Sequence, residues 1–228
     1  QYPPLGSMNI LVSAYKSYLS KRFNIKEVAN DNILNLGGTR EGTFSVIQSL
    51  FNKKIKSKKP YVLMPNPFYQ IYGGATLLAG GISKQINLNE DNGFSLDLNS
   101  INENIWKKCQ IFVACSPSNP TGSVLKEDEI RKIIKLSRKY GFYIVSDECY
   151  IDIYRESKPK SFIEISYKQF RNFKNIVSLH SLSKRSNLPG FRSGMICGDK
   201  KLINNFKKYR SFHGVSICLL YTSDAADD

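Results

Sequence analysis

Apolar residues recur along this chain in two spacings, one typical of strands and one typical of helices. Short apolar or alternating segments predict strands, and they cover residues 33–36, 61–64, 82–88, 110–114, 142–146, 175–179 and 194–197. Apolar positions three and four residues apart predict helices over residues 8–22, 39–51, 126–140 and 200–210, and a further helix that ends at residue 78. Pro65 and Pro67 are expected to end the second strand.

Strands that alternate with helices predict an α/β fold, with a mostly parallel sheet sandwiched by helices. In such sheets the ligand binds beyond the carboxyl ends of the strands. Residues with reactive or charged side chains gather in the loops that follow Leu36, Met64, Ala114, Ser146 and Leu179. We therefore expect one site along that edge of the sheet.

The composition is that of a globular protein, because 41% of the 228 residues are hydrophobic and 23% are charged. No apolar run approaches the roughly 20 residues that cross a bilayer, so a membrane-spanning role is excluded. The first residues, Gln1-Tyr2-Pro3-Pro4, lack the features of a signal peptide, and the chain does not begin with Met. We expect a cytoplasmic protein whose chain begins inside a longer one.

The formal net charge of +14 makes nucleic acid a candidate partner. The basic residues are scattered, however, and their one local cluster, residues 53–59, falls between a helix and a strand, where a solvated loop is expected. The sequence shows no nucleic-acid recognition module. A nucleic-acid-binding protein is therefore only a remote alternative, and the same charge suits anionic substrates.

The cysteines and histidines do not have the spacing of metal ligands. No two of the five cysteines form a C-x-x-C pair, which favours reduced thiols in a cytosolic protein. His180 and His213 are the only histidines and lie far apart in the sequence, without matching cysteines or acids. No metal site is predicted.

Five motifs occupy the loops at the strand ends. They read Gly37-Gly38-Thr39-Arg40-Glu41-Gly42, Asn66-Pro67-Phe68-Tyr69, Ser116-Pro117-Ser118-Asn119-Pro120-Thr121-Gly122, Asp147-Glu148-Cys149-Tyr150 and His180-Ser181-Leu182-Ser183-Lys184, with Arg192 eight residues further on. Each alone is weak, since Asn-Pro-Thr-Gly is an ordinary turn sequence. Together, from Tyr2 to about His213, they resemble the fold-type I aminotransferases of class I/II, which depend on pyridoxal 5′-phosphate (PLP). The resemblance implies the large, PLP-binding domain of that fold.

The resemblance places three residues at the centre of the PLP chemistry. Lys184 matches the catalytic lysine that forms a Schiff base with the PLP aldehyde and moves a proton between the substrate Cα and the cofactor C4′. Arg192 matches the phosphate-binding arginine, because a guanidinium suits phosphate oxygens. Asp147 matches the carboxylate that pairs with the pyridinium nitrogen, with a helix N-cap as the lesser alternative.

Other residues match contacts to the cofactor phosphate. Ser181 matches a hydroxyl donor, with Ser183 as a less certain helper. Gly38, Thr39 and Arg40 match the turn whose backbone N–H groups open a helix toward the phosphate. A tight turn alone would also explain the paired glycines.

The remaining matches concern the ring and the partner subunit. Asn119 and Tyr150 match donors to the phenolic oxygen of the ring. Tyr69 matches an aromatic ring stacked on the cofactor, although a lone tyrosine more often serves packing. Tyr2 matches a tyrosine that reaches the phosphate of the neighbouring subunit's cofactor, which implies a homodimer with shared active sites.

Longer stretches around these motifs look like succinyldiaminopimelate transaminases. The implied reaction exchanges the amino group of N-succinyl-LL-2,6-diaminopimelate with 2-oxoglutarate, in bacterial diaminopimelate and lysine synthesis. Arg40 or Arg185, each beside a cofactor motif, is expected to help hold the succinyl carboxylate. The alternatives are another enzyme of the same class, acting on aspartate or aromatic amino acids, and a C–S β-lyase.

The resemblance also sets the expected domain boundaries. Residues 1–217 are expected to form the PLP-binding large domain, incomplete at both ends. Residues 218–228 resemble translated adapter sequence and are expected to be non-native. The C-terminal small domain, which in the family supplies the arginine for the substrate α-carboxylate, is missing, so we expect this segment alone to be weakly active or inactive.

Overall fold

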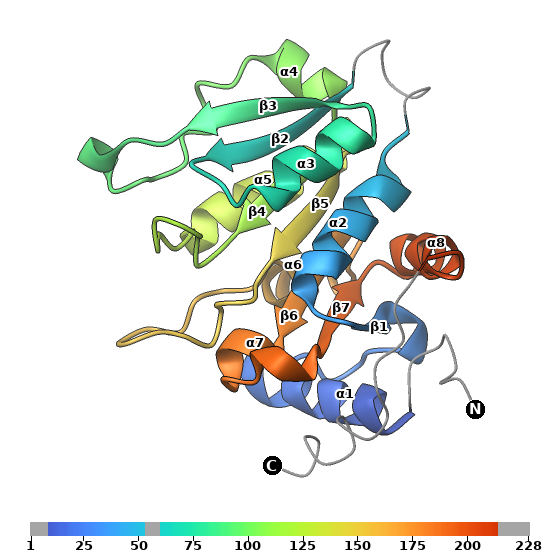
Figure 1. Cartoon of the computed structure of the whole chain (residues 1–228). Helices are drawn as coiled ribbons and strands as arrows, with labels where there is room; N and C mark the ends of the chain where they lie inside the picture. Colours follow the sequence, from blue (N-terminus) through green and yellow to red (C-terminus); the bar gives the residue numbers. More distant parts are fainter. Residues whose placement is uncertain (1–8, 53–59, 214–228) are drawn as a thin grey trace.

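In the described part of the chain, seven strands form one sheet in the order β1-β7-β6-β5-β4-β2-β3 (Figure 1). The computed structural model describes residues 9–52 and 60–213. Its strands are β1 (Ile33–Leu36), β2 (Tyr61–Asn66), β3 (Ile82–Asn87), β4 (Cys109–Cys115), β5 (Tyr143–Asp147), β6 (Ile176–Ser181) and β7 (Gly194–Gly198). β7 runs antiparallel to both of its neighbours, and the other pairs are parallel. The expected mostly parallel sheet is confirmed, with β7 as its exception.

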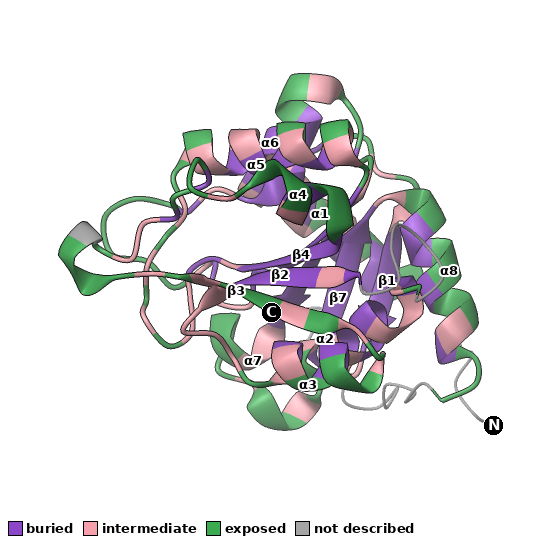
Figure 2. Ribbon diagram, turned by 90° about the horizontal axis from the view of Figure 1, so that it is seen from above, coloured by how far each residue is buried: buried purple, intermediate pink, exposed green. Residues whose placement is uncertain are grey.

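Helices cover both faces of this sheet (Figure 2). One face carries α2 (Thr39–Leu50), α3 (Ile71–Leu78) and α8 (Lys200–Arg210). The other carries α1 (Asn9–Phe23), α4 (Glu103–Lys108), α5 (Glu127–Tyr140) and α6 (Phe162–Phe170). The short helix α7 (Leu182–Arg185) directly follows β6. This arrangement agrees with the fold class that the sequence predicts.

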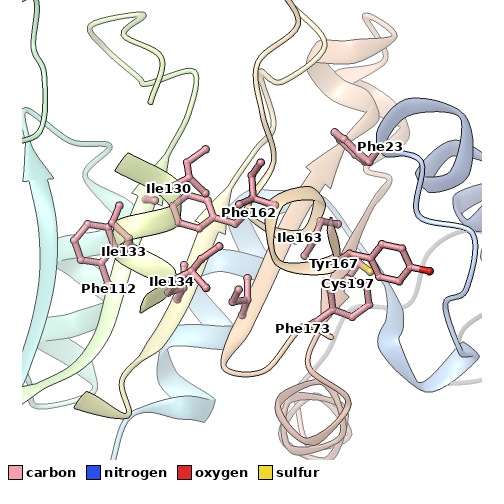
Figure 3. Packing of buried hydrophobic residues seen from close by; sticks show 14 of the residues in the cluster. Phe23, Phe112, Ile130, Ile133, Ile134, Phe162, Ile163, Tyr167, Phe173 and Cys197 are labelled. Carbon is pink, nitrogen blue, oxygen red and sulfur yellow. The ribbon is translucent and has the colours of Figure 1, made fainter. Parts of the chain in front are cut away.

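The alternation of side chains along the strands divides the core between the two faces. In β4, Phe112 packs in the cluster beneath α5, whereas Ile111 and Val113 pack in the cluster beneath α2 and α3. Figure 3 shows Ile133 of α5 on the same side of the sheet as Phe112. Each fully buried aliphatic side chain of this kind contributes about 1.5–3 kcal/mol. The same alternation decides which residues at the strand ends face the site.

Two sequence expectations need correction. β2 does not stop at Pro65 but continues to Asn66, because beyond Leu63 it pairs only with β3 and the missing proline N–H interrupts no second ladder. Helices α4, α6 and α7 were not expected from the apolar spacing. For α6 a local signal exists, since Ser161 and Glu164 form a capping box at its start.

Some expectations concern residues outside the described ranges. Tyr2, the basic cluster at residues 53–59 and the tail at residues 218–228 are among them. Within residues 9–52 and 60–213, no helix combines the length and the apolar character needed to cross a membrane.

Candidate active site

A cavity of about 580 Å³ opens at the carboxyl-end edge of the sheet. β1, β2, β4, β5 and β6 all end at this edge, and the antiparallel β7 begins there. The residues that line the cavity are Thr39, Arg40, Tyr69, Tyr72, Cys115, Asn119, Asp147, Cys149, Tyr150, Ser181, Ser183, Lys184, Pro189 and Arg192. The site residues expected from the sequence line it, with three exceptions: Gly38, which lies against the lining residue Arg192; Arg185, which is described below; and Tyr2, which lies outside the described residues.

Asp147 is the last residue of β5 and is 4% exposed. Its Oδ2 accepts a hydrogen bond of 2.9 Å from the Tyr72 hydroxyl, and its Oδ1 accepts one of 3.3 Å from the Cys149 backbone N–H. Burial raises the pKa of this carboxyl, and the donors from Tyr72 and Cys149 oppose that rise. A turn rather than a helix follows Asp147, so the structure does not use it as a helix cap.

Arg192 lies just before β7, in a left-handed conformation with φ 49°. Its guanidinium donates to the carbonyl oxygens of Pro189 (2.9 Å) and Gly37 (3.3 Å). A Cβ atom added at Gly38 would overlap that guanidinium, and the φ of +103° at Gly38 is itself unfavourable for other residues. Gly38 also precedes the first turn of α2, whose N-terminal N–H groups lie at the cavity. Positive charge and helix N–H groups therefore meet at one end of the cavity, an arrangement suited to an anion.

Lys184 is exposed and belongs to α7, which follows directly from the end of β6. Its Nζ lies 5.8 Å from the centre of the Tyr150 ring. The Ser181 Oγ accepts from the Ser183 N–H (3.1 Å), which fixes the start of α7. The capping serine therefore determines where the lysine amine enters the cavity.

Tyr69 and Asn119 reach the cavity from loops that follow β2 and β4. The Tyr69 ring stands edge-on to the Tyr72 ring, with centroids 5.8 Å apart. The Asn66–Pro67 and Asn119–Pro120 peptide bonds beside these two residues are cis.

The two arginines that were expected near a substrate carboxylate lie in different places. Arg40 is exposed and lines the cavity. Arg185 instead lies 3.5 Å from Asp152 and packs its guanidinium 4.5 Å from the Tyr18 ring centre, on the α1 side. Of the two alternatives that the sequence left open, Arg40 therefore lines the cavity and Arg185 does not, because its ion pair with Asp152 turns it away.

Sequence reasoning missed Tyr72, Cys115 and Cys149 in the cavity wall. Burial and the neighbouring Asp147 raise the pKa of both thiols, to about 12 for Cys115, so both are protonated at neutral pH. The signal for Tyr72 was its spacing, since it lies three residues after Tyr69 at the start of a helix and therefore on the same side.

A second buried acid lies behind the cavity, on the α1 side of the sheet. The Glu148 Oε1 accepts hydrogen bonds from Ser146 (2.9 Å), Ser178 (3.1 Å) and the Phe162 N–H (3.0 Å). Its Oε2 lies 3.5 Å from Nε2 of His180. Burial raises the pKa of Glu148 to about 7 and lowers that of His180 to about 3.

Comparison with known proteins relates this site to a family. The sequence profile described as "Aminotransferase class I and II" matches residues 1–226. The crystal structure of an aminotransferase from Neisseria meningitidis Z2491 has 40% sequence identity and a TM-score of 0.90, over 99% of this chain and 57% of that one. The aminotransferase AspB from Helicobacter pylori 26695 has 33% identity and a TM-score of 0.90, over 99% and 59%.

A curated relative adds a substrate name. The LL-diaminopimelate aminotransferase of Natranaerobius thermophilus is 29% identical, over 92% of this chain and 52% of its own length. The chain therefore spans about half the length of the curated relatives that it matches.

Proposed function

Because this chain belongs to the class I and II aminotransferases, whose members use PLP, we propose that its cavity binds PLP and that the protein transfers amino groups between amino acids and 2-oxo acids. The observation that carries the proposal is the convergence of three unlike groups on one cavity. They are the amine of Lys184, the carboxylate of Asp147 and the guanidinium of Arg192. The aldehyde of PLP requires an amine, its pyridine nitrogen requires an anion, and its phosphate ester requires a cation.

The residues present fit this cofactor at each of its ends. The missing side chain at Gly38 lets the Arg192 guanidinium lie against the N-terminus of α2, where the phosphate would be held. Asp147 would hold the ring nitrogen, Tyr69 would cover the ring, and Asn119 and Tyr150 would donate to its phenolic oxygen.

When bound, PLP supplies an electron sink that acidifies the substrate Cα–H bond. The chain's own contribution is proton transfer and orientation. With PLP bound, the Lys184 Nζ would act as the base that takes the proton from the substrate Cα and as the acid that returns it. The α7 cap at Ser181 holds that amine at the cavity, and the Asp147 carboxylate would keep the ring nitrogen protonated.

For the substrate we propose N-succinyl-LL-2,6-diaminopimelate, with 2-oxoglutarate as the amino acceptor, in diaminopimelate and lysine synthesis. The named relative supports a diaminopimelate-type amino acid, and the motif resemblance supports its succinylated form. Arg40 is the exposed cation of the cavity wall that this proposal assigns to the succinyl carboxylate.

The test is an assay on the protein expressed from its complete natural gene. Donors are N-succinyl-LL-diaminopimelate, LL-diaminopimelate, aspartate and phenylalanine, each with 2-oxoglutarate. Arg40→Met is expected to raise KM for the succinylated donor by about 10–100-fold, the value of one charge-assisted contact, and KM for phenylalanine much less. The matched control Arg185→Met, whose arginine pairs with Asp152, is expected to leave both KM values within about twofold.

Other outcomes decide between substrates. Faster turnover of LL-diaminopimelate than of its succinyl derivative would replace the substrate proposal and leave transamination intact. Release of pyruvate from cysteine conjugates without 2-oxoglutarate would indicate a C–S β-lyase. We also propose a homodimer in which Tyr2 completes the partner's site; activity recovered on mixing Lys184→Ala with Tyr2→Phe subunits would support it, and its absence would contradict it.

A further inference from the structure

Tyr72 is a buried hydroxyl that the proposed reaction does not itself use. It is 2% exposed, it lines the cavity, and its hydroxyl donates to Asp147 Oδ2 at 2.9 Å. Two features bring the pair together. Asp147 follows Val145 by two positions on β5, so both face the α3 side of the sheet, where Tyr72 packs. The Tyr72 N–H also bonds to the Tyr69 carbonyl at 3.1 Å, which fixes the first turn of α3.

We propose that Tyr72 is a positioning residue whose hydroxyl keeps the Asp147 carboxylate ionised and oriented, so that the site prefers a cofactor ring with a protonated nitrogen. The inference rests on the proposed placement of PLP with its ring nitrogen at Asp147. Oδ2 is held by Tyr72 and Oδ1 by the Cys149 N–H, so both oxygens have fixed directions before a ligand arrives. These two donors offset the cost of burying the carboxylate. The neighbouring thiols of Cys115 and Cys149 are protonated at neutral pH.

The segment from Tyr69 to Tyr72 therefore affects the proposed cofactor ring in two ways. Tyr69 lies at the cavity to cover the ring, and Tyr72, three residues on and edge-to-face with it, reaches the carboxylate. Any shift of this segment would move both tyrosines together, so the position of the ring and the orientation of the Asp147 carboxylate would change together.

The experiment compares two cofactors in the purified apoprotein. One is PLP, and the other is 1-deaza-PLP, in which a C–H replaces the ring nitrogen while the aldehyde and phosphate remain. Dissociation constants are measured by absorbance titration for the wild type, Tyr72→Phe and the control Tyr143→Phe, which lies at the other end of β5. Tyr72→Phe is expected to weaken PLP binding about tenfold and deaza-PLP binding less than twofold. The variant loses the hydrogen bond to Asp147 with either cofactor, but only the protonated ring nitrogen depends on an ionised and oriented Asp147 carboxylate. Tyr143→Phe is expected to change neither.

Each other outcome is decisive. Equal weakening of both cofactors, or no weakening of either, would overturn the inference and make Tyr72 a packing residue only. Asp147→Asn is measured in parallel and is expected to weaken PLP binding more than deaza-PLP binding; if it weakens both equally or neither, the placement of the ring nitrogen at Asp147 fails and the inference falls with it. Should Tyr72→Phe not fold, 3-fluorotyrosine at position 72 keeps the packing and makes a stronger donor; a PLP preference that does not rise would contradict the role.

Discussion

The buried Glu148–His180 pair gives a sharp prediction about stability and pH. In the folded protein the Glu148 pKa is raised to about 7 and the His180 pKa is lowered to about 3. The raised pKa of Glu148 stabilises the fold in full below 4.5, the pKa of the carboxyl in the unfolded chain, and this stabilisation is lost as pH rises through about 7. The lowered pKa of His180 stabilises the fold in full above 6.5, the pKa of histidine in the unfolded chain, and this stabilisation is lost as pH falls toward about 3.

Between these unfolded values the two contributions cancel. From pH 4.5 to 6.5 the unfolded pair binds one proton, on the histidine, and the folded pair also binds one. The proton count is the same whether that folded proton resides on Glu148 or on His180, 3.5 Å away. Folding therefore exchanges no protons at this pair, and the pair adds no slope to the free energy of unfolding in this window.

When either partner is removed, the free energy of unfolding should change by about 1.4 kcal/mol per pH unit, and the sign should be opposite in the two single variants. Glu148→Gln leaves the histidine alone, so its stability should fall by about 2 kcal/mol from pH 6.5 to pH 5. His180→Gln leaves the carboxyl alone, so its stability should fall by about 2 kcal/mol from pH 5 to pH 6.5. Asp152, Arg22 and Arg185 also face His180, but they are present in every variant and drop out of the comparison.

The assay is urea unfolding of the apoprotein at pH 5.0, 5.75 and 6.5, on the wild type, both single variants and the double variant. The double variant should have the same pH slope as the wild type, because neither protein exchanges protons at this position. Single variants that parallel the wild type within about 0.3 kcal/mol per pH unit would refute the reasoning, as would slopes of the same sign in both.

Three further predictions follow from particular positions. Gly38→Ala should weaken PLP binding, measured by absorbance titration, because its Cβ would overlap the Arg192 guanidinium; unchanged affinity would refute the phosphate position. The matched change Gly74→Ala, inside α3 with no atom within 4 Å of the added Cβ, should leave PLP affinity unchanged and raise the free energy of unfolding by about 0.5–1 kcal/mol in urea. Ser161→Ala should cost about 1 kcal/mol in the same assay, since its Oγ accepts from the Ile163 N–H at the start of α6, whereas an unchanged midpoint would show that the cap adds nothing.

The edge of the sheet at which the site lies could be predicted from the sequence, because the carboxyl ends of parallel strands meet at one edge. The position of Lys184 and Asp147 at that edge follows from the rule, whereas their expected roles came from the family resemblance. Arg192 does not, since it precedes its strand; it reaches the same edge only because β7 runs antiparallel, and the apolar run 194–197 carries no information on direction. The sequence also could not show which of the neighbouring basic residues Lys184 and Arg185 faces the cavity. In the structure Lys184 lines the cavity, whereas Arg185 pairs with Asp152 and turns away from it.

Asp147 and Glu148 show that a perturbed pKa does not by itself mark a functional carboxylate. Both are buried at the end of β5, and burial raises the pKa of both. Successive residues point to opposite faces, so Asp147 faces the open cavity and Glu148 faces the closed interior beside His180. In the proposed complex a cationic ring nitrogen would reach Asp147 and stabilise its charge, whereas the described neighbours of Glu148 are Ser146, Ser178, Phe162 and His180, and burial favours its protonated form. Access to the cavity, rather than a raised pKa, therefore separates the acid that we propose as a ligand contact from the acid that is buried behind the cavity.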